Sequence, residues 1–294
     1  MRQTPLRCRD SDPVVVNAFG YLSSYRHGLN AIFPLCLFSS RNPIMSTFKL
    51  ISVKYGTSGT FDPWIEDGRT DAWFQNMAGS QQYFGWLSEY NTPTQSIRPG
   101  TYGGKFSIAA NISQTFITDV EIVNTLIVAL DHNEVPPPDE TTLYTLHIPR
   151  EVGIDFYGML SCKIATSPKD GFCGYHFSFK YRGVQVKYAV LPYSSDFPNC
   201  GATFEDFSGT LSHEIAETIT DPLGSSYRDD CNREIGDICA HINGFAKGTD
   251  NNDYPVQLLW SNSRRECYAG IPSTKSTDAS VKGSTKKTFL RSMR

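Results

Sequence analysis

Residues 207–221 constrain the fold of this chain more than any other stretch. Apolar residues recur there at every fourth position, as Phe207, Leu211, Ile215 and Ile219. This spacing predicts an α-helix with an apolar stripe along one side. Asp206 is placed to cap the helix at its start, and Pro222 ends it at Asp221. The chain therefore contains a helix that buries one face against the rest of the fold.

A second face of the same helix carries polar residues in the pattern HExxE. His213 and Glu217 stand one turn apart, the separation at which two side chains of one helix reach a single cation, and Glu214 lies beside them. In zinc hydrolases of the HExxH type, the outer positions hold the metal and the inner glutamate takes a proton from the attacking water. We therefore expect His213 and Glu217 as metal ligands and Glu214 as the catalytic base. The alternative is an ordinary pair on a solvated helix face, worth only about 0.2–0.5 kcal/mol.

An acidic segment downstream supplies the remaining groups of such a site. Glu234 and Asp237 follow the helix within the stretch EIGD. On a second short helix, Glu234 would be the third metal ligand, and Asp237 would hydrogen-bond the far nitrogen of His213 as a supporting residue. Thermolysin-like gluzincins are similar in this order, with HExxH first, then a glutamate, then an aspartate a turn later.

This ligand set predicts a definite geometry. His213 Nε2, a Glu217 oxygen and a Glu234 oxygen should converge on one point, at about 2.0–2.2 Å from each. Crowded carboxylates should also raise the pKa of His213 and of at least one glutamate. If Glu234 points away, Asp221 or His176 is the alternative third ligand. Zinc is the expected metal, although a carboxylate-rich set also suits manganese or calcium.

The remaining segments predict an α+β fold, a zincin-like single domain over residues 46–270 with a mixed twisted sheet and the motif helix packed on it. Thr118 and Glu121 form a capping box. Alternating side chains on both sides of Arg182-Gly183 predict a hairpin. The expected strands are 48–55, 143–148, 175–181, 184–190 and 254–260, the other expected helices lie within 73–77, 80–90 and 119–130, and 92–104 is expected to be a loop.

The two ends of the chain are expected to lie outside this domain. Residues 1–45 hold only a short apolar run interrupted by Pro34, a poor signal peptide. We interpret them as a leader or disordered extension, with Met45 as an alternative start to Met1. Residues 271–294 are rich in Ser, Thr and Lys and are expected to be a disordered basic tail. No run of 18 apolar residues occurs, so no membrane span is expected.

Charge and cysteine content narrow the expected partners and compartment. With 27 basic and 30 acidic residues and no basic stripe before the tail, nucleic acid is not an expected partner, and we expect a monomer. Six of the 8 cysteines lie in the second half of the chain, without a CxxC pair. They favour three disulfides over a Cys-ligated zinc, with Cys239–Cys267 as the first expected pair. Reduced thiols in a cytoplasmic protein are the alternative.

Five segments together resemble the exordium, or phosphate-induced protein, family. Plant members carry CGFH, KYA, HELAE ending in NP, EIGDLC and a WSP-type strand in this order. The corresponding segments are GFCGYH at Gly171–His176, VKYAV at Val186–Val190, SHEIAETITDP at Ser212–Pro222, EIGDIC at Glu234–Cys239 and VQLLWSN at Val256–Asn262. The resemblance implies a secreted, cell-wall-associated protein and names no reaction. The poor signal peptide, Asp221 where plant members have Asn, and fewer cysteines around Cys200 than in the plant CPGxC pattern together favour a microbial relative.

Two functions are expected as alternatives. The first is a metal-dependent, peptidase-like hydrolase with Glu214 as base and with His213, Glu217 and Glu234 as ligands, acting on a peptide or a cell-wall polymer. The second is a non-catalytic, exordium-like extracellular protein in which the same cluster holds a structural or vestigial metal. A metal without an open coordination position would favour the second.

Overall fold

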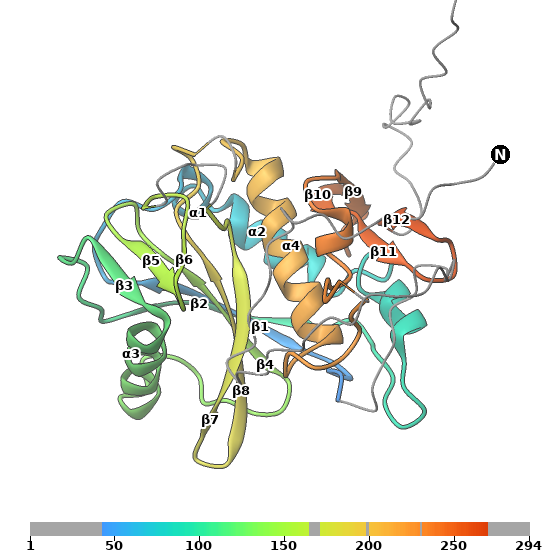
Figure 1. Cartoon of the computed structure of the whole chain (residues 1–294), viewed down its shortest axis with the longest axis horizontal. Coiled ribbons are helices and arrows are strands. Elements are labelled where there is room, and N and C mark those ends of the chain that lie inside the picture. Colours follow the sequence, from blue (N-terminus) through green and yellow to red (C-terminus); the bar gives the residue numbers. More distant parts are fainter. Residues whose placement is uncertain (1–42, 165–170, 198–199, 230, 270–294) are drawn as a thin grey trace, which may run out of the picture.

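The computed structural model describes residues 43–164, 171–197, 200–229 and 231–269. The expected leader and basic tail therefore lie almost wholly outside the described residues (Figure 1). Within the described ranges, no helix is both long and apolar enough to cross a membrane.

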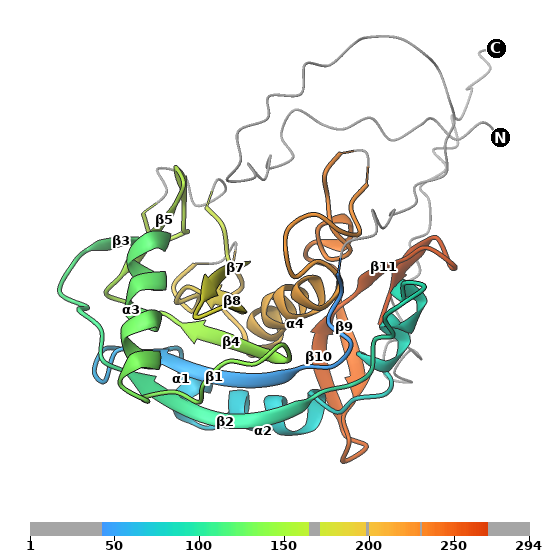
Figure 2. The same cartoon turned by 90° about the horizontal axis from the view of Figure 1, so that it is seen from below.

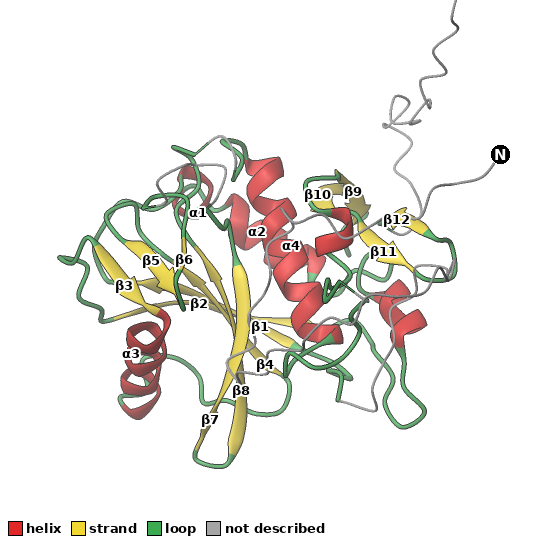
Figure 3. Ribbon diagram, viewed as in Figure 1, coloured by secondary structure: helices red, strands yellow, loops and turns green. Residues whose placement is uncertain are grey.

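A five-stranded mixed sheet forms the centre of the fold (Figure 3). Its strands lie in the order β2-β1-β4-β8-β7, and all neighbours are parallel except the β7–β8 hairpin at one edge. Strand β4 is buried at every position, as expected for a strand covered on both faces. The bounds are β1 Lys49–Tyr55, β2 Thr101–Ile108, β4 Thr142–His147, β7 Tyr175–Tyr181 and β8 Val184–Leu191.

Two hydrophobic cores lie on opposite faces of this sheet. Side chains alternate along β1, so that Leu50 belongs to one core while Ile51 and Val53 belong to the other. Helices α1, α2, η1 and α4 contribute to the core of Leu50, and α3 contributes to the second core (Figure 2). The bounds are α1 Pro63–Glu66, α2 Arg69–Met77, η1 Gly85–Tyr90, α3 Asp119–Asp131 and α4 Phe204–Thr220.

Smaller sheets complete the domain on both sides of the main one. A three-stranded sheet has the order β3-β5-β6, and two antiparallel pairs join β9 to β10 and β11 to β12. Helix α4 packs against β10 as well as against the β7–β8 hairpin. The bounds are β3 Phe116–Thr118, β5 Gly153–Phe156, β6 Met159–Leu160, η3 Asp237–Cys239, β9 Asn243–Lys247, β10 Asp253–Gln257, β11 Leu259–Ser261 and β12 Glu266–Tyr268.

The predicted α+β class is confirmed, and so are several local predictions. Thr118 and Glu121 form the capping box of α3. The hairpin turns at Arg182 and Gly183, whose φ angles of 47° and 90° are the positive values that a tight primed turn requires. Cys239 and Cys267 form a disulfide across a Cα separation of 5.7 Å.

Other boundaries differ from the sequence predictions. Helix α4 begins at Phe204 because Thr203, with an extended φ of −122°, is its cap, and Asp206 lies in the first turn. The expected helix over 80–90 is a short 3₁₀ helix, and the expected loop over 92–104 already contains the start of β2. The expected strand over 254–260 is divided between two sheets, as β10 and β11.

Candidate metal centre

Helix α4 brings the motif residues to the interior of the protein. Its apolar stripe lies in the core, and another face of the helix contacts β7 and, through Glu217, the turn that leads into η3. Glu214 and Glu217 are 6% and 3% exposed, respectively, and the side chain of His213 is 13% exposed. The interpretation of His213 and Glu217 as a pair on a solvated helix face is therefore wrong. Buried carboxylates of this kind require charged or hydrogen-bonding partners.

The second motif glutamate fixes the EIGD turn. Glu217 Oε1 accepts hydrogen bonds from the backbone N–H groups of Gly236 and Asp237, at 2.9 and 3.0 Å. Gly236 lies so close to the imidazole of His213 that an added Cβ would stand 2.7 Å from the ring. The EIGD turn thus packs directly against α4. Glu217 Oε2, which does not bind the turn, faces the site.

The first group of potential ligands surrounds His213 Nε2. Glu217 Oε2 lies 2.9 Å from this nitrogen and Asp237 Oδ1 lies 3.8 Å from it. The far nitrogen, Nδ1, lies 3.3 Å from the side-chain carbonyl oxygen of Gln257, the acceptor that Nδ1–H needs when Nε2 binds a cation, and the Gln257 amide nitrogen donates to the Gly236 carbonyl. Gln257 therefore takes the supporting place expected for Asp237, and Asp237 lies on the ligand side of the imidazole.

His176 reaches the site from the edge strand β7. Its Nδ1 lies 3.2 Å from Glu214 Oε2 and 3.7 Å from Glu217 Oε2, and its Nε2 lies 3.6 Å from Glu234 Oε1. The side chain is 9% exposed. The alternation of the hairpin placed His176 on the face opposite the strand's aromatic residues, and this face proves to be the one that packs on α4.

Glu234 is anchored by one oxygen only. Arg228 donates to Glu234 Oε2 at 2.8 Å and to Asp221 Oδ2 at 2.9 Å. Asp221 Oδ1 accepts from the backbone N–H groups of Ser225 and Ser226, so this carboxylate closes the loop after α4. Glu234 Oε1 is buried and makes no hydrogen bond among the described residues. A buried oxygen without a donor marks a place where a cation or water belongs.

The carboxylates control the protonation of the two imidazoles. Burial alone lowers the pKa of His213, but Glu217 and Glu214 outweigh it and hold this pKa well above the usual value. The pKa of His176 is raised for the same reason, because the hydrogen bond to Glu214 and the nearby charges exceed the effect of burial. The predicted rise for His213 is confirmed.

The carboxyl groups are shifted in opposite directions. Burial and the negative charge of Glu217 raise the pKa of Asp237 to about 6 and that of Glu234 well above its usual range. Burial also acts to raise the pKa of Glu217, but the neighbouring His213 lowers it further than burial raises it. The predicted rise for at least one glutamate is thus confirmed at Glu234. With every carboxyl group ionised, the site would hold more negative charge than Arg228 and the two imidazoles neutralise.

Two overlapping groups of three residues place their ligand atoms within 4.8 Å of one another among the described residues of this region. One is His213, Glu217 and Asp237, and the other is His176, Glu214 and Glu217. The expected third ligand, Glu234, belongs to neither group and lies beside His176 instead. Asp237 belongs to the group that contains His213 and Glu217. Imidazole nitrogen with carboxylate oxygen is a donor set suited to zinc or manganese.

Sequence comparison with known protein families, and searches among curated proteins and solved structures, find no match to this chain. The resemblance to the exordium family stays a prediction.

Proposed function

We propose that the chain is a metal-dependent hydrolase whose divalent cation is held by His213, Glu217 and Asp237. The observation that carries the proposal is the convergence of these side chains, from α4 and the η3 turn, beside a buried Glu234 oxygen that makes no hydrogen bond to any residue the structure describes. An excess of buried carboxylates is costly unless a cation compensates it. Zinc is the proposed metal, with manganese as the alternative for so carboxylate-rich a set.

Asp237 replaces Glu234 in this ligand set because of where its oxygen lies. Asp237 Oδ1 is on the Nε2 side of His213, and its side chain is 30% exposed, so this side of the centre is open to water. Glu234 is held against Arg228 and faces His176 instead. A catalytic site needs an open position for water and substrate, and the Asp237 side offers it.

Glu214 is the proposed catalytic base, and His176 is its partner. A bound divalent cation lowers the pKa of water and polarises a substrate carbonyl. Glu214 Oε2 is adjacent to the ligands and accepts the proton of the attacking water in this scheme. His176 Nδ1, 3.2 Å from the same oxygen, orients the carboxylate and stabilises its charge.

A peptide is the proposed substrate, and β7 supports this choice. β7 pairs with β8 alone among the described strands, so its outer edge is unpaired, and it carries His176 into the site. An extended peptide can add to such an edge through its main-chain hydrogen bonds. The mixed sheet with a motif helix packed beside its antiparallel edge also supports a zincin-like architecture.

The second candidate is a non-catalytic, secreted relative of the exordium family. The burial of Glu214, Glu217 and Glu234 favours it, because a closed centre would serve as a structural metal site. The Cys239–Cys267 disulfide is consistent with an extracellular location for either function, since such bonds persist in oxidising compartments.

Metal content and hydrolysis of the purified full chain test the proposal together. We expect about one zinc or manganese ion per chain after dialysis, and cleavage of an unstructured protein substrate such as casein. Glu214→Gln should retain the metal and lower the cleavage rate by about 10²–10⁴-fold. Retained metal with no cleavage of protein or cell-wall polysaccharide by the wild type would support the non-catalytic alternative. Absence of metal at millimolar zinc and manganese would refute both.

A further inference from the structure

One imidazole nitrogen and one carboxylate oxygen face each other outside the proposed ligand set. His176 Nε2 lies 3.6 Å from Glu234 Oε1, and the two side chains are 9% and 5% exposed. A separation of 3.6 Å is too long for a hydrogen bond. Two ligands of one tetrahedral zinc ion, each about 2.1 Å from the metal, are about 3.4 Å apart. The two atoms are therefore spaced as ligands of a shared cation.

Glu214 decides which nitrogen of His176 can bind a cation. His176 Nδ1 lies 3.2 Å from Glu214 Oε2. An ionised carboxylate only accepts hydrogen bonds, so Nδ1 carries the proton of the neutral imidazole and Nε2 keeps its lone pair. A carboxylate that holds the far nitrogen is the usual support of a metal-binding histidine. His176 thus has the support of a metal ligand, with Nε2 facing Glu234.

Arg228 orients Glu234 through its other oxygen. The guanidinium donates to Glu234 Oε2 at 2.8 Å and to Asp221 Oδ2 at 2.9 Å, and the Arg228 side chain is only 12% exposed. Glu234 Oε1 is buried and makes no hydrogen bond to the residues that the structure describes. The ion pair therefore fixes the carboxylate while leaving one oxygen to serve as a ligand.

The backbone holds both residues in place. His176 pairs with Ala189 of β8 inside the hairpin. The Glu234 N–H donates to Asp237 Oδ2 at 3.0 Å, while Asp237 Oδ1 lies on the Nε2 side of His213. One turn thus supplies Asp237 to the proposed metal centre and Glu234 to the pair with His176.

We propose that His176 Nε2 and Glu234 Oε1 bind a second divalent cation, with water completing its coordination. The proposal gives a role to the buried oxygen of Glu234 and to the two potential ligands that the first centre leaves out. Imidazole nitrogen with carboxylate oxygen suits zinc or manganese. Because the protein supplies only two ligands, this cation binds more weakly than the first and is lost on dialysis.

The second cation acts on hydrolysis through His176. When Nε2 is bound to a cation, the imidazole is fixed, and its Nδ1–H holds Glu214, the proposed base, through the 3.2 Å contact. Occupation of the second site should therefore raise the rate of hydrolysis. The site itself rests on its own geometry, and only this effect on the rate rests on the proposed function.

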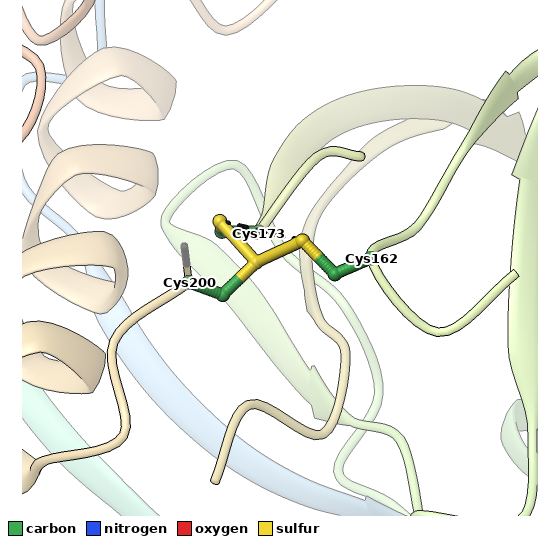
Figure 4. A group of neighbouring side chains, drawn as sticks. All are labelled: Cys162, Cys173 and Cys200. Atoms are coloured by element: carbon green, nitrogen blue, oxygen red, sulfur yellow. Dashed lines mark hydrogen bonds between the residues drawn. A yellow bond between two sulfur atoms is a disulfide. The ribbon is translucent and has the colours of Figure 1, made fainter. Parts of the chain in front are cut away.

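The cysteines near the start of α4 do not offer a competing cation site. Figure 4 shows the remaining group of potential ligands in the described ranges, Cys162, Cys173 and Cys200. Cys200 Sγ is at disulfide distance from its neighbours. A sulfur in a disulfide is not a metal ligand, because ligation requires the thiolate.

Manganese titration of the dialysed, zinc-loaded full chain tests the site. Bound manganese disappears from the solution EPR spectrum, so the free ion can be counted directly. We expect one manganese ion per chain in addition to the zinc, and nitrogen coupling from an imidazole in the pulsed EPR spectrum of the bound ion. His176→Ala should remove that coupling. No manganese bound at millimolar concentration, or a bound ion without nitrogen coupling, would overturn the proposal.

Two matched variants test the carboxylate ligand. Glu234→Gln and Glu205→Gln each remove one negative charge, but Glu205 lies exposed in the first turn of α4. We expect Glu234→Gln to weaken manganese binding by more than about 10-fold, the smallest loss that even a supporting residue of a metal site shows. Glu205→Gln should leave it unchanged. Equal losses would mean that net charge alone attracts the ion, and the site would be refuted.

His213→Ala separates this proposal from the proposed function. It removes the first centre, so the variant should hold no zinc after dialysis and still bind one manganese ion with nitrogen coupling. A wild-type chain that keeps zinc but binds no manganese would refute the second site and leave the proposed function standing. A wild-type chain without zinc or cleavage, together with manganese binding by His213→Ala, would refute the proposed function and leave the second site standing.

Discussion

Tyr175 and His176 are adjacent on β7, and their side chains contact two different acidic clusters on opposite faces of the sheet. On one face, the hydroxyls of Tyr175 and Tyr188 both donate to Asp119 Oδ1 at 2.7 Å. On the other, His176 faces the carboxylates of α4 and of the EIGD turn. The Asp119 cluster is almost inaccessible to solvent, whereas the second cluster opens to water at Asp237, and their chemistry differs.

The difference lies in the balance between donors and charges. Asp119 is one carboxylate with two neutral donors, and Phe156 stacks on Tyr175 at 4.2 Å to seal it. The cluster at Glu217 holds several carboxylates with shared donors, and Glu234 Oε1 makes no hydrogen bond among the described residues, with His176 Nε2 3.6 Å away. Burial of a carboxylate therefore does not by itself indicate a ligand site. A carboxylate left without enough donors does.

The largest expected effect is on zinc affinity, which substitutions in the Glu217 cluster should weaken and substitutions in the Asp119 cluster should not. Glu217→Gln removes a ligand, so we expect zinc affinity to fall by more than about 100-fold, beyond the range for supporting residues. Asp119→Asn is the matched control and should leave the affinity unchanged, because it lies on the other face. Isothermal titration with zinc measures both. Equal losses in the two variants would mean that the change acts through folding rather than ligation.

The next effect is on the free energy of unfolding. Here the substitution at Asp119, which should not affect metal affinity, has the large effect. Asp119→Ala leaves two buried tyrosine hydroxyls without an acceptor, which should lower the free energy of unfolding by about 3 kcal/mol. Tyr175→Phe removes one donor and should cost about 1 kcal/mol. Urea denaturation of the metal-free protein gives both values. An Asp119→Ala protein as stable as the wild type would show that Asp119 is not held by these hydrogen bonds.

The third effect is a pH dependence of stability that the metal should invert. The folded-state pKa of His213 is raised above its unfolded value. Its contribution is therefore complete below about pH 6.5 and is lost as the pH rises through the folded-state pKa. With a chelator, the free energy of unfolding should fall above pH 6.5, by at most about 1.4 kcal/mol per pH unit for this group.

Zinc should change the sign of that slope. Metal ligands bind as neutral imidazole and as carboxylate, so protons compete with zinc at low pH. The pKa of Asp237, raised to about 6 by burial and Glu217, lies in the same window. Melting temperatures measured from pH 5.5 to 8.5 with zinc should rise where those with chelator fall. Parallel curves in the two conditions would contradict a metal centre at these residues.

The smallest expected effect concerns Glu234. Its pKa is raised well above the usual range by burial and by Glu217, so the charge is unfavourable in the metal-free fold at neutral pH. Glu234→Gln should raise the metal-free stability at pH 7 by less than about 1 kcal/mol, and this gain should vanish at about pH 3, where the carboxyl is protonated in both states. Asp221→Asn is the control and should destabilise, since it weakens the Arg228 pair without removing an unpaired oxygen.

The sequence predicted the part of the site that lies on one element. His213, Glu214 and Glu217 follow from helical spacing alone, and Glu234 and Asp237 from a local segment. His176 and Gln257 come from strands distant in sequence, and only the register and packing of those strands place them beside α4. The alternation of side chains along β7 predicts that His176 lies on the face opposite the aromatic residues. It does not predict that α4 packs on that face.

The same limit applies to the fold. Strand β2 was not predicted because Gly103 and Gly104 weaken its pattern. Gly103 lies where a Cβ would meet the Ile51 side chain at 2.4 Å, and Gly104 has a φ of 110°. The register of β1 against β2 shifts at this point, so the glycines serve an irregular strand pair that only the tertiary structure reveals.

Gly236 gives this centre a means of being recognised in other genomes. Since any Cβ at this position would stand 2.7 Å from the His213 ring, a chain with the same turn must keep glycine between the glutamate and the aspartate. In the pattern HExxE followed by ExGD, the acidic residues and the histidine are the proposed site residues, and the glycine is required because no side chain fits beside the histidine ring. Proteins too divergent for whole-chain comparison can be sorted by whether the glycine persists, and one that keeps the acidic residues but loses it should have a different turn.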